Sequence, residues 1–89
     1  MPAVYVLRSH STGKLYVGFT NDPVQRLGQH NAGITKSTRN RGPWELVYTE
    51  PYPSRTAAMK RERYLKTGRG REELKGLIAL SNSAPALRG

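Results

Sequence analysis

Two short segments of β-forming residues, 3–8 and 15–20, lie on either side of six residues that favour turns. The first segment reads Ala-Val-Tyr-Val-Leu-Arg and the second reads Leu-Tyr-Val-Gly-Phe-Thr. Two such runs around a short loop that contains glycine predict a β-hairpin. An antiparallel sheet is therefore the expected base of the fold, against which the rest of the chain packs its apolar residues.

A helix and a third strand are expected next. Asp22 can cap a helix whose first residue is Pro23, and the helix should end near residue 30, where Gly33 supplies a left-handed stop. Val24 and Leu27 are expected to pack on the sheet. The third strand is expected over residues 44–50.

Two further helices complete the expected chain. Ser54 can cap a helix over residues 55–67, Gly68-Arg69-Gly70 should break it, and a last helix is expected over residues 71–80. The order ββαβαα predicts an α+β fold in which helices pack on a three-stranded antiparallel sheet. With 89 residues in all, we expect one domain over residues 1–80 and a loose tail over residues 81–89.

The charge of the chain favours a polyanionic partner. Lys and Arg number 15 against six Asp and Glu, which gives a formal net charge of +9. Residues 55–75 hold eight of the basic side chains and three acidic ones. Such a balance points first to nucleic acid and second to an anionic membrane.

Several classes of protein are excluded or disfavoured. The chain has no cysteine, which excludes disulfides, thiolate zinc sites and iron–sulfur clusters. No apolar run approaches the ~18–20 residues of a membrane span, and the N-terminus does not read as a signal peptide. A cytoplasmic protein without a membrane partner is the expectation.

Glu62 falls inside the apolar arc of its expected helix, between Ala58 and Leu65. A carboxylate there is costly unless it is paired or bound to a cation. Lys66 follows four residues later, and this spacing alone favours an exposed ion pair over a metal site. If Glu62 is a metal ligand, we expect its carboxylate to face the sheet surface that carries Tyr5 and Tyr16.

Two other groups of residues have a functional and a structural interpretation. Tyr5 and Tyr16 share a face of the hairpin if Gly18 lies opposite Tyr5, and they are either a functional pair or ordinary sheet aromatics. Arg26 and His30 are four residues apart and share a helix face. They either meet a phosphate, or are a solvated arginine and a histidine whose cation the helix dipole favours.

Taken in order, these residues resemble the GIY-YIG nuclease domain. The resemblance covers about residues 3–80 and is closest in kind to the small single-domain bacterial members, which are likened to the N-terminal domain of an excinuclease. It rests on Val4-Tyr5-Val6, Tyr16-Val17-Gly18, Asp22-x-x-x-Arg26-x-x-x-His30-Asn31, Pro43-Trp44-Glu45-Leu46-Val47-Tyr48 and Arg55-x-x-Ala58-x-x-x-Glu62-x-x-Leu65-Lys66.

The resemblance implies a divalent-metal-dependent DNA endonuclease, with DNA repair or recombination as its setting. It implies that Tyr5 or Tyr16 is the general base toward the attacking water, and the family leaves open which. Arg26 is expected to hold the scissile phosphate, and His30 to assist proton transfer or phosphate binding. Glu62 is expected to be the single protein ligand of Mg²⁺ or Mn²⁺.

The remaining expectations concern binding. Gly18 matches the glycine of the second motif, and Arg71, on the last helix, is expected to lie away from the motif residues. The expected substrate is duplex or branched DNA, with a protein partner as a source of specificity. The side chains expected to contact it are Arg26, Lys36, Arg39, Arg41, Arg61 and Lys66.

The sequence departs from the family pattern in two places. Ala3 replaces the first glycine, which is a small change, and the late asparagine of several members has Asn82 as its nearest candidate. An alternative function is a basic nucleic-acid-binding module that has the nuclease fold and little or no turnover. A third is a small RNA-binding protein without catalytic function.

Overall fold

The central strand of the sheet is β1 (Ala3–Ser9), which pairs antiparallel with β2 (Leu15–Thr20) on one side and with β3 (Trp44–Pro51) on the other. The computed structural model, which describes residues 1–82, thus confirms the expected hairpin and the antiparallel sheet. Tyr5 lies opposite Gly18, so Tyr5 and Tyr16 share one face of the hairpin.

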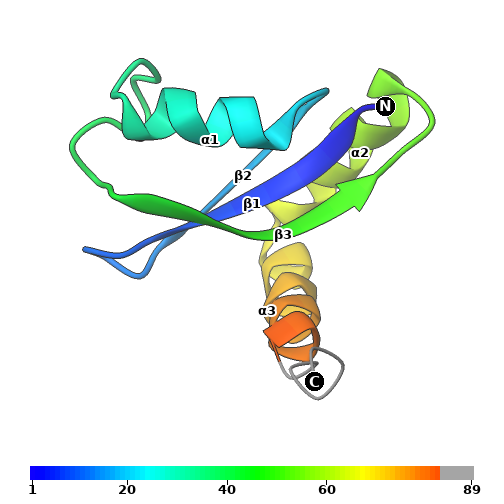
Figure 1. Cartoon of the computed structure of the whole chain (residues 1–89). Coiled ribbons are helices and arrows are strands. Elements are labelled where there is room, and N and C mark those ends of the chain that lie inside the picture. The colour runs from blue at the N-terminus through cyan, green and yellow to red at the C-terminus, as the bar shows by residue number, and fades with distance from the viewer. Residues whose placement is uncertain (83–89) are drawn as a thin grey trace, which may run out of the picture.

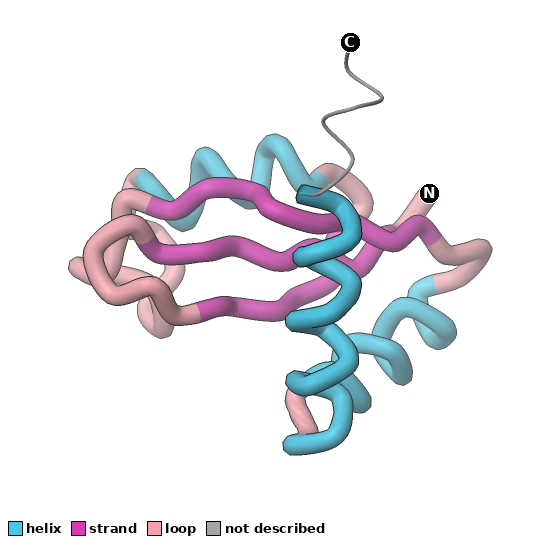
Figure 2. Tube along the Cα trace, turned by 90° about the horizontal axis from the view of Figure 1, so that it is seen from below, coloured by secondary structure: helices cyan, strands magenta, loops and turns pink. Residues whose placement is uncertain are grey.

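The side chains of β1 alternate between the two faces of the sheet. Val4 and Val6 face α2 (Arg55–Leu65) and α3 (Gly68–Asn82) and join the larger apolar core, with Leu65, Leu74 and Ile78. Tyr5 and Leu7 face α1 (Pro23–Asn31) and form a smaller cluster with Trp44. In Figure 1, α1 lies on one side of the sheet and α3 runs away from the other. Figure 2 shows α3 crossing the strands, with α1 behind them.

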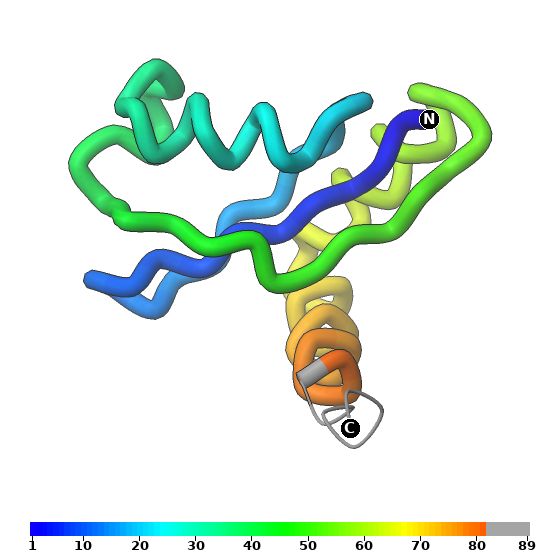
Figure 3. The backbone as a smooth tube through the Cα atoms, viewed as in Figure 1, coloured from blue at the N-terminus to red at the C-terminus, as the bar shows by residue number. Residues whose placement is uncertain are grey.

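The helix starts are held by the expected caps. The Asp22 carboxylate accepts a hydrogen bond from the Gln25 backbone N–H at 3.0 Å, and the Ser54 hydroxyl accepts one from the Ala57 N–H at 3.1 Å. After α1, Gly33 has a φ of +78°, which confirms the left-handed stop. The connection from α1 to β3 folds into a turn at the end of α1 (Figure 3).

The structure corrects the expected break between the last two helices. The chain turns at Lys66 and Thr67, and α3 already begins at Gly68. Gly70 lies inside α3 and allows it to touch the end of α2, since a Cβ there would come within 1.9 Å of the Tyr64 carbonyl oxygen. Glycine is thus needed there for close packing, and not as a helix breaker. The helix continues to residue 82, and residues 83–89 of the expected tail lie outside the described residues.

The expectation for α1 also needs correction. Leu27 packs against the Tyr5 cluster, but Val24 is 72% exposed. The inward face of α1 is centred between Leu27 and His30, and Val24 lies roughly 90° around the helix from that centre. Within residues 1–82, no helix combines the length and hydrophobicity that crossing a membrane requires.

A charged network ties β3 to α2 and α3. The Glu50 carboxylate accepts hydrogen bonds from Tyr48, Tyr52 and Arg61, and Arg61 also pairs with Glu73. Burial alone would raise the pKa of Glu50, but the hydrogen bonds from Arg61 and the two tyrosines outweigh it and lower the pKa overall. The network therefore stabilises the folded protein only while Glu50 is ionised.

Replacing Glu50 by Gln is expected to lower the free energy of unfolding by about 2 kcal/mol near pH 7, because Arg61 keeps its charge and loses its main partner. A lowered folded-state pKa stabilises the protein above the ordinary glutamate value of about 4.3, and this contribution is lost as pH falls through the folded-state pKa. Denaturant unfolding between pH 7 and 3 measures this contribution of Glu50 to the free energy of unfolding. The variant should lose less stability on acidification than the parent, and Glu72→Gln, on an exposed pair, should behave like the parent.

Candidate active site

A buried chain of hydrogen bonds runs from β1 through α1 to the following loop. The Tyr5 hydroxyl lies 2.8 Å from His30 Nε2, and His30 Nδ1 lies 2.7 Å from the Thr38 hydroxyl. All three side chains are fully buried. The structural interpretation of His30, as a histidine whose cation the helix dipole favours, is therefore wrong, because α1 turns the imidazole inward onto the sheet.

Burial favours the neutral forms of the Tyr5 hydroxyl and the His30 imidazole. It raises the pKa of the Tyr5 hydroxyl, although the nearby Arg26 guanidinium acts in the opposite direction through hydrogen bonding and charge. Burial also lowers the pKa of His30, and the charge of Arg26 lowers it further. The resting site thus holds a protonated tyrosine against a neutral imidazole.

Tyr16 completes an aromatic cluster at the β2 edge of the sheet. Its ring centroid lies 4.8 Å from that of His30 and 6.2 Å from that of Tyr5. Tyr16 is half-buried, while Tyr5 is buried, so the two tyrosines differ in their access to solvent. The structure thus brings Tyr5, Tyr16 and His30 together, as a functional cluster requires.

Gly18 leaves room for the phenol of Tyr5 across the hairpin. A Cβ at this position would lie 2.7 Å from the Tyr5 hydroxyl oxygen and 2.8 Å from two ring carbons. No side chain fits there unless the phenol moves, which explains why a strand facing a buried tyrosine carries glycine at this point.

Replacing Gly18 by Ala is expected to displace the Tyr5 hydroxyl from His30 and to reduce any catalysis that uses this pair by more than ~10²-fold. Overpacking should cost about 1–3 kcal/mol of stability at the same time. Single-turnover rates and denaturant unfolding measure the two effects. Gly28→Ala is the matched control, because a Cβ there meets nothing within 4 Å. A Gly18→Ala variant with parental activity would show that catalysis does not depend on the contact between the Tyr5 hydroxyl and His30.

Arg26 lies beside the buried pair, on the same helix as His30. Its guanidinium donates a 2.7 Å hydrogen bond from Nη1 to the Gln29 side-chain oxygen and is half-buried. It lies close enough to Tyr5 and His30 to influence the pKa of both. A planar cation here is suited to hold a phosphate over the tyrosines.

Glu62 reaches the same edge of the sheet from α2. Its side chain is 13% exposed and pairs with Lys66, whose Nζ lies 6.0 Å from the centroid of the Tyr16 ring. The ion pair favoured by the spacing is thus present, but Glu62 does not point into solvent. Lys66 is the ion-pair partner that the carboxylate has within residues 1–82.

The donor set fits a hard divalent cation held by a single carboxylate. Within the described part of the chain, no three His, Asp or Glu side chains form a preassembled metal cage. Mg²⁺ does not need one, because it retains several waters and is commonly bound by one or two carboxylates together with substrate phosphate. Glu62 is the carboxylate on α2 that is suited to this purpose, since it is largely buried and its partner Lys66 lies near Tyr16.

A hollow of about 830 Å³ opens beside Tyr16, between the end of the hairpin and the junction of α2 and α3. Its floor is apolar, from Leu15, Val17, Leu65 and Leu74. Its rim carries the cations Lys14, Lys66, Arg71 and Lys75. We call this hollow the basic groove.

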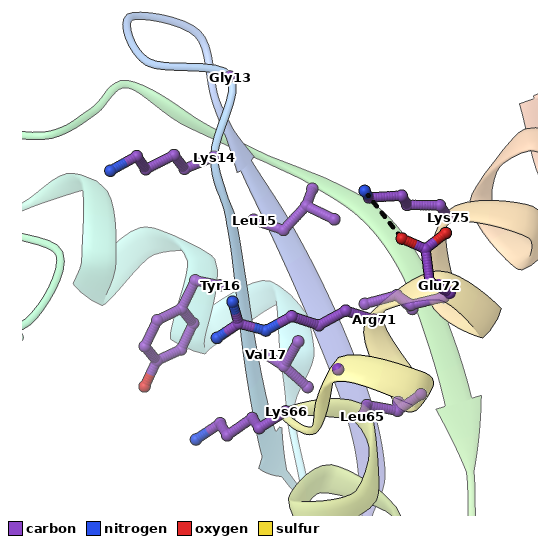
Figure 4. Close-up of a pocket in the computed structure, with 12 residues that line it drawn as sticks. Gly13, Lys14, Leu15, Tyr16, Val17, Leu65, Lys66, Arg71, Glu72 and Lys75 are labelled. Atoms are coloured by element: carbon purple, nitrogen blue, oxygen red, sulfur yellow. Dashed lines mark ion pairs between the residues drawn. The ribbon is translucent and has the colours of Figure 1, made fainter.

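The basic groove corrects the expected position of one arginine. Arg71 extends from α3 toward β2 and ends beside Tyr16, whereas it was expected to lie away from the motif residues (Figure 4). The chain turn at Lys66 and Thr67 directs α3 across the strands (Figure 2) and brings Arg71 to this position. Glu72 in the groove pairs with Lys75 at 3.5 Å, while Lys14 and Arg71 have no ion-pair partner within residues 1–82.

The other expected nucleic-acid contacts fall into two groups. Lys36, Arg39 and Arg41 are exposed on the loop that follows α1. Arg61 is committed to Glu50 and Glu73, so its charge is already neutralised within the fold. We therefore leave Arg61 out of the interface that we propose. The candidate Asn82 ends α3, and its side chain lies outside the described residues.

Sequence reasoning missed the residues that support the cluster from behind. Thr38 comes from a polar loop without periodicity, and no local pattern marks it as buried. Asn31 bridges the Trp44 backbone, accepting from its N–H at 2.7 Å and donating to its carbonyl oxygen at 3.0 Å. An asparagine at a helix end followed by Trp at the start of a strand is the only hint of that bridge.

Comparisons with known proteins match most of the chain. A family model described as the GIY-YIG catalytic domain matches residues 1–75. A UPF0213 protein of Natronomonas pharaonis is 46% identical over 65 residues, which cover 72% of this chain and 75% of that protein. A UPF0213 protein of Staphylococcus epidermidis is 40% identical over 73 residues, covering 81% and 88%.

Two further comparisons bear on fold and chemistry. The solution structure of the UPF0213 protein BH0048 from Bacillus halodurans is similar with a TM-score of 0.53 and 38% identity, covering 86% of this chain and 85% of that one. The structure-specific endonuclease subunit SLX1 of Mus musculus is 41% identical over 64 residues. The match covers 66% of this chain but only 24% of that protein, so this chain corresponds to about a quarter of its length.

Proposed function

This chain belongs to the GIY-YIG catalytic domain family, and from that premise we propose that it is a divalent-metal-dependent endonuclease that hydrolyses phosphodiester bonds in DNA. The observation that carries the proposal is the convergence of Tyr5, Tyr16 and His30 at one edge of the sheet, with Arg26 beside them. A similar domain occurs in a structure-specific endonuclease subunit, which supports DNA as the substrate.

The buried pair supports Tyr5 as the base and His30 as its proton acceptor. A protonated tyrosine is a poor base by itself, and burial makes its ionisation harder still. Its proton can pass to the neutral His30 Nε2, 2.8 Å away, while its oxygen takes a proton from the attacking water. A bond then forms between the water oxygen and phosphorus, the bond to the leaving oxygen breaks, and that oxygen takes a proton from solvent.

Charge around the phosphate comes from two sides. The planar guanidinium of Arg26 holds two phosphate oxygens at once. Glu62 is the residue that would hold Mg²⁺ or Mn²⁺, beside its ion-pair partner Lys66. When bound, such an ion neutralises the charge that develops on the phosphate and the leaving oxygen.

The proposal is tested by nicking assays on supercoiled plasmid and on branched DNA, with Mg²⁺, Mn²⁺ or EDTA. We expect cleavage with either ion and none with EDTA. A purified protein that binds DNA but cuts neither substrate in either ion would contradict the proposed activity. Tyr5→Phe protein, which keeps the ring and loses the hydroxyl, controls for contaminating nuclease.

One observation favours a second candidate, a nucleic-acid-binding module without turnover. Lys66 neutralises Glu62, and a carboxylate that remains paired holds no metal. Isothermal titration with Mg²⁺ in the presence of uncleavable phosphorothioate DNA separates the two functions. Metal uptake that disappears in the Glu62→Gln protein supports the nuclease, and identical titrations for both proteins support the binding module.

Binding is expected to be electrostatic and steeply salt-dependent, with the basic groove as part of the path of the DNA backbone. If about five phosphates are neutralised, log K against log salt should have a slope near −4 to −5. Replacing Arg71 by Ala should weaken affinity and reduce the magnitude of the slope by about 1. Fluorescence anisotropy at salt concentrations from ~50 to ~300 mM measures both quantities. A slope unchanged by Arg71→Ala would place the DNA elsewhere.

A further inference from the structure

Thr38 contacts His30 on the side opposite to Tyr5. Its hydroxyl oxygen lies 2.7 Å from His30 Nδ1 and 3.4 Å from the Thr35 backbone carbonyl oxygen. A carbonyl oxygen only accepts, so the Thr35 carbonyl is a second acceptor, at a long distance, toward which the single hydroxyl proton of Thr38 can point. The hydroxyl oxygen is then left to accept a hydrogen bond from a protonated His30 Nδ1.

The tautomer of His30 decides what Tyr5 can do. A neutral imidazole carries one N–H, so a proton on Nδ1 leaves Nε2 as a bare acceptor. Nε2 lies 2.8 Å from the Tyr5 hydroxyl, which then donates to it. With the opposite tautomer, Nε2 would donate to the Tyr5 oxygen and could take no proton from it.

The loop holds Thr38 in place through its backbone. The indole Nε1 of Trp44 donates to the Thr38 carbonyl oxygen at 3.1 Å, and the Trp44 backbone is bridged by Asn31 on the helix that carries His30. Thr38 is fully buried, and Trp44 also contacts the Tyr16 ring edge-on, with centroids 6.4 Å apart. Helix, loop and strand are thus fixed to one another around the imidazole.

We propose that Thr38 is a positioning residue that fixes His30 in the Nδ1–H tautomer, so that Nε2 accepts the proton of Tyr5. This inference rests on the proposed nuclease function for its consequence but not for its geometry. The titratable and charged groups that face His30 are Tyr5, Tyr16 and Arg26. None of them contacts Nδ1 in residues 1–82, which leaves Thr38 to decide the tautomer.

The first test reads the tautomer directly, without any activity. Two-dimensional ¹⁵N–¹H correlation spectra distinguish protonated from unprotonated ring nitrogens, and the exposed His10 is the only other histidine in the chain. We expect Nδ1–H for His30 in the unmodified protein near neutral pH, and in Thr38→Ser. Thr38→Val should move the population toward Nε2–H. An Nε2–H tautomer in the unmodified protein overturns the proposal, even if no variant folds.

The second test reads the consequence for cleavage. Thr38→Val should lower the single-turnover rate by ~10²-fold with DNA affinity unchanged, and Thr38→Ser should restore it to within a few-fold. Thr56→Val, at an exposed position on α2, is the matched control. A Thr38→Val protein that cleaves like its parent overturns the positioning role. A parent protein that cleaves nothing instead overturns the proposed function and leaves the tautomer assignment intact.

Discussion

Replacing Glu62 by Gln is expected to lower the rate of DNA cleavage by about 10³-fold or more, which corresponds to roughly 4 kcal/mol of transition-state stabilisation. The amide keeps the size of the side chain but loses the charge that would hold a divalent ion. Glu62 pairs with Lys66, whose ammonium lies near the Tyr16 ring, so the substitution removes the proposed ligand at this edge of the sheet.

Single-turnover rates at saturating Mg²⁺ measure this effect, and DNA affinity is measured separately at the same salt concentration. Glu45→Gln is the control, since Glu45 pairs with Arg8 on the neighbouring strand and lies outside the basic groove. Its rate should remain near that of the parent. Equal rates for Glu62→Gln and the parent would remove Glu62 as the metal ligand and would leave its ion pair as its main role.

Replacing Arg26 by Lys should lower the cleavage rate by ~10²-fold and leave DNA affinity nearly intact. Lysine keeps the positive charge but loses the planar fork that binds two phosphate oxygens at once. Replacement by Ala should lower the rate further. The effect is expected on the chemical step because Arg26 lies beside the Tyr5–His30 pair.

The control for this experiment has to come from outside the basic groove. Arg71 is unsuitable because it ends beside Tyr16, whereas Arg63 is exposed on α2. Arg63→Lys should change neither the rate nor the affinity appreciably. Equal losses at positions 26 and 63 would mean that Arg26 contributes only to general attraction for DNA.

The order of helices and strands could be predicted because its signals are local. Caps at Asp22 and Ser54 and the turn residues of the hairpin act within a few residues of themselves. The junction of α2 and α3 could not be predicted in the same way. Gly70 reads as a breaker in sequence, but the approach of Tyr64 in the neighbouring helix determines what it does. That contact exists only after packing.

The residues of the candidate site could be predicted from the sequence, but the contacts among them could not. The hairpin register places Tyr5 opposite Gly18, and this follows from the pairing of two strands. The burial of His30 depends on the angle at which α1 lies on the sheet, and the role of Thr38 depends on how the loop after it folds back. Neither angle nor loop path leaves a pattern in the residues themselves.

The alternation of side chains along β1 separates two kinds of tolerance to mutation within one strand. Val4 and Val6 serve only the core under α2 and α3, while Tyr5 between them belongs to the site under α1. Substitutions that repack the face under α2 and α3 can therefore raise the thermal stability of the fold without changing the face under α1, which carries Tyr5. A library of variants scored separately for folding and for cleavage should show a period of two along residues 4–7.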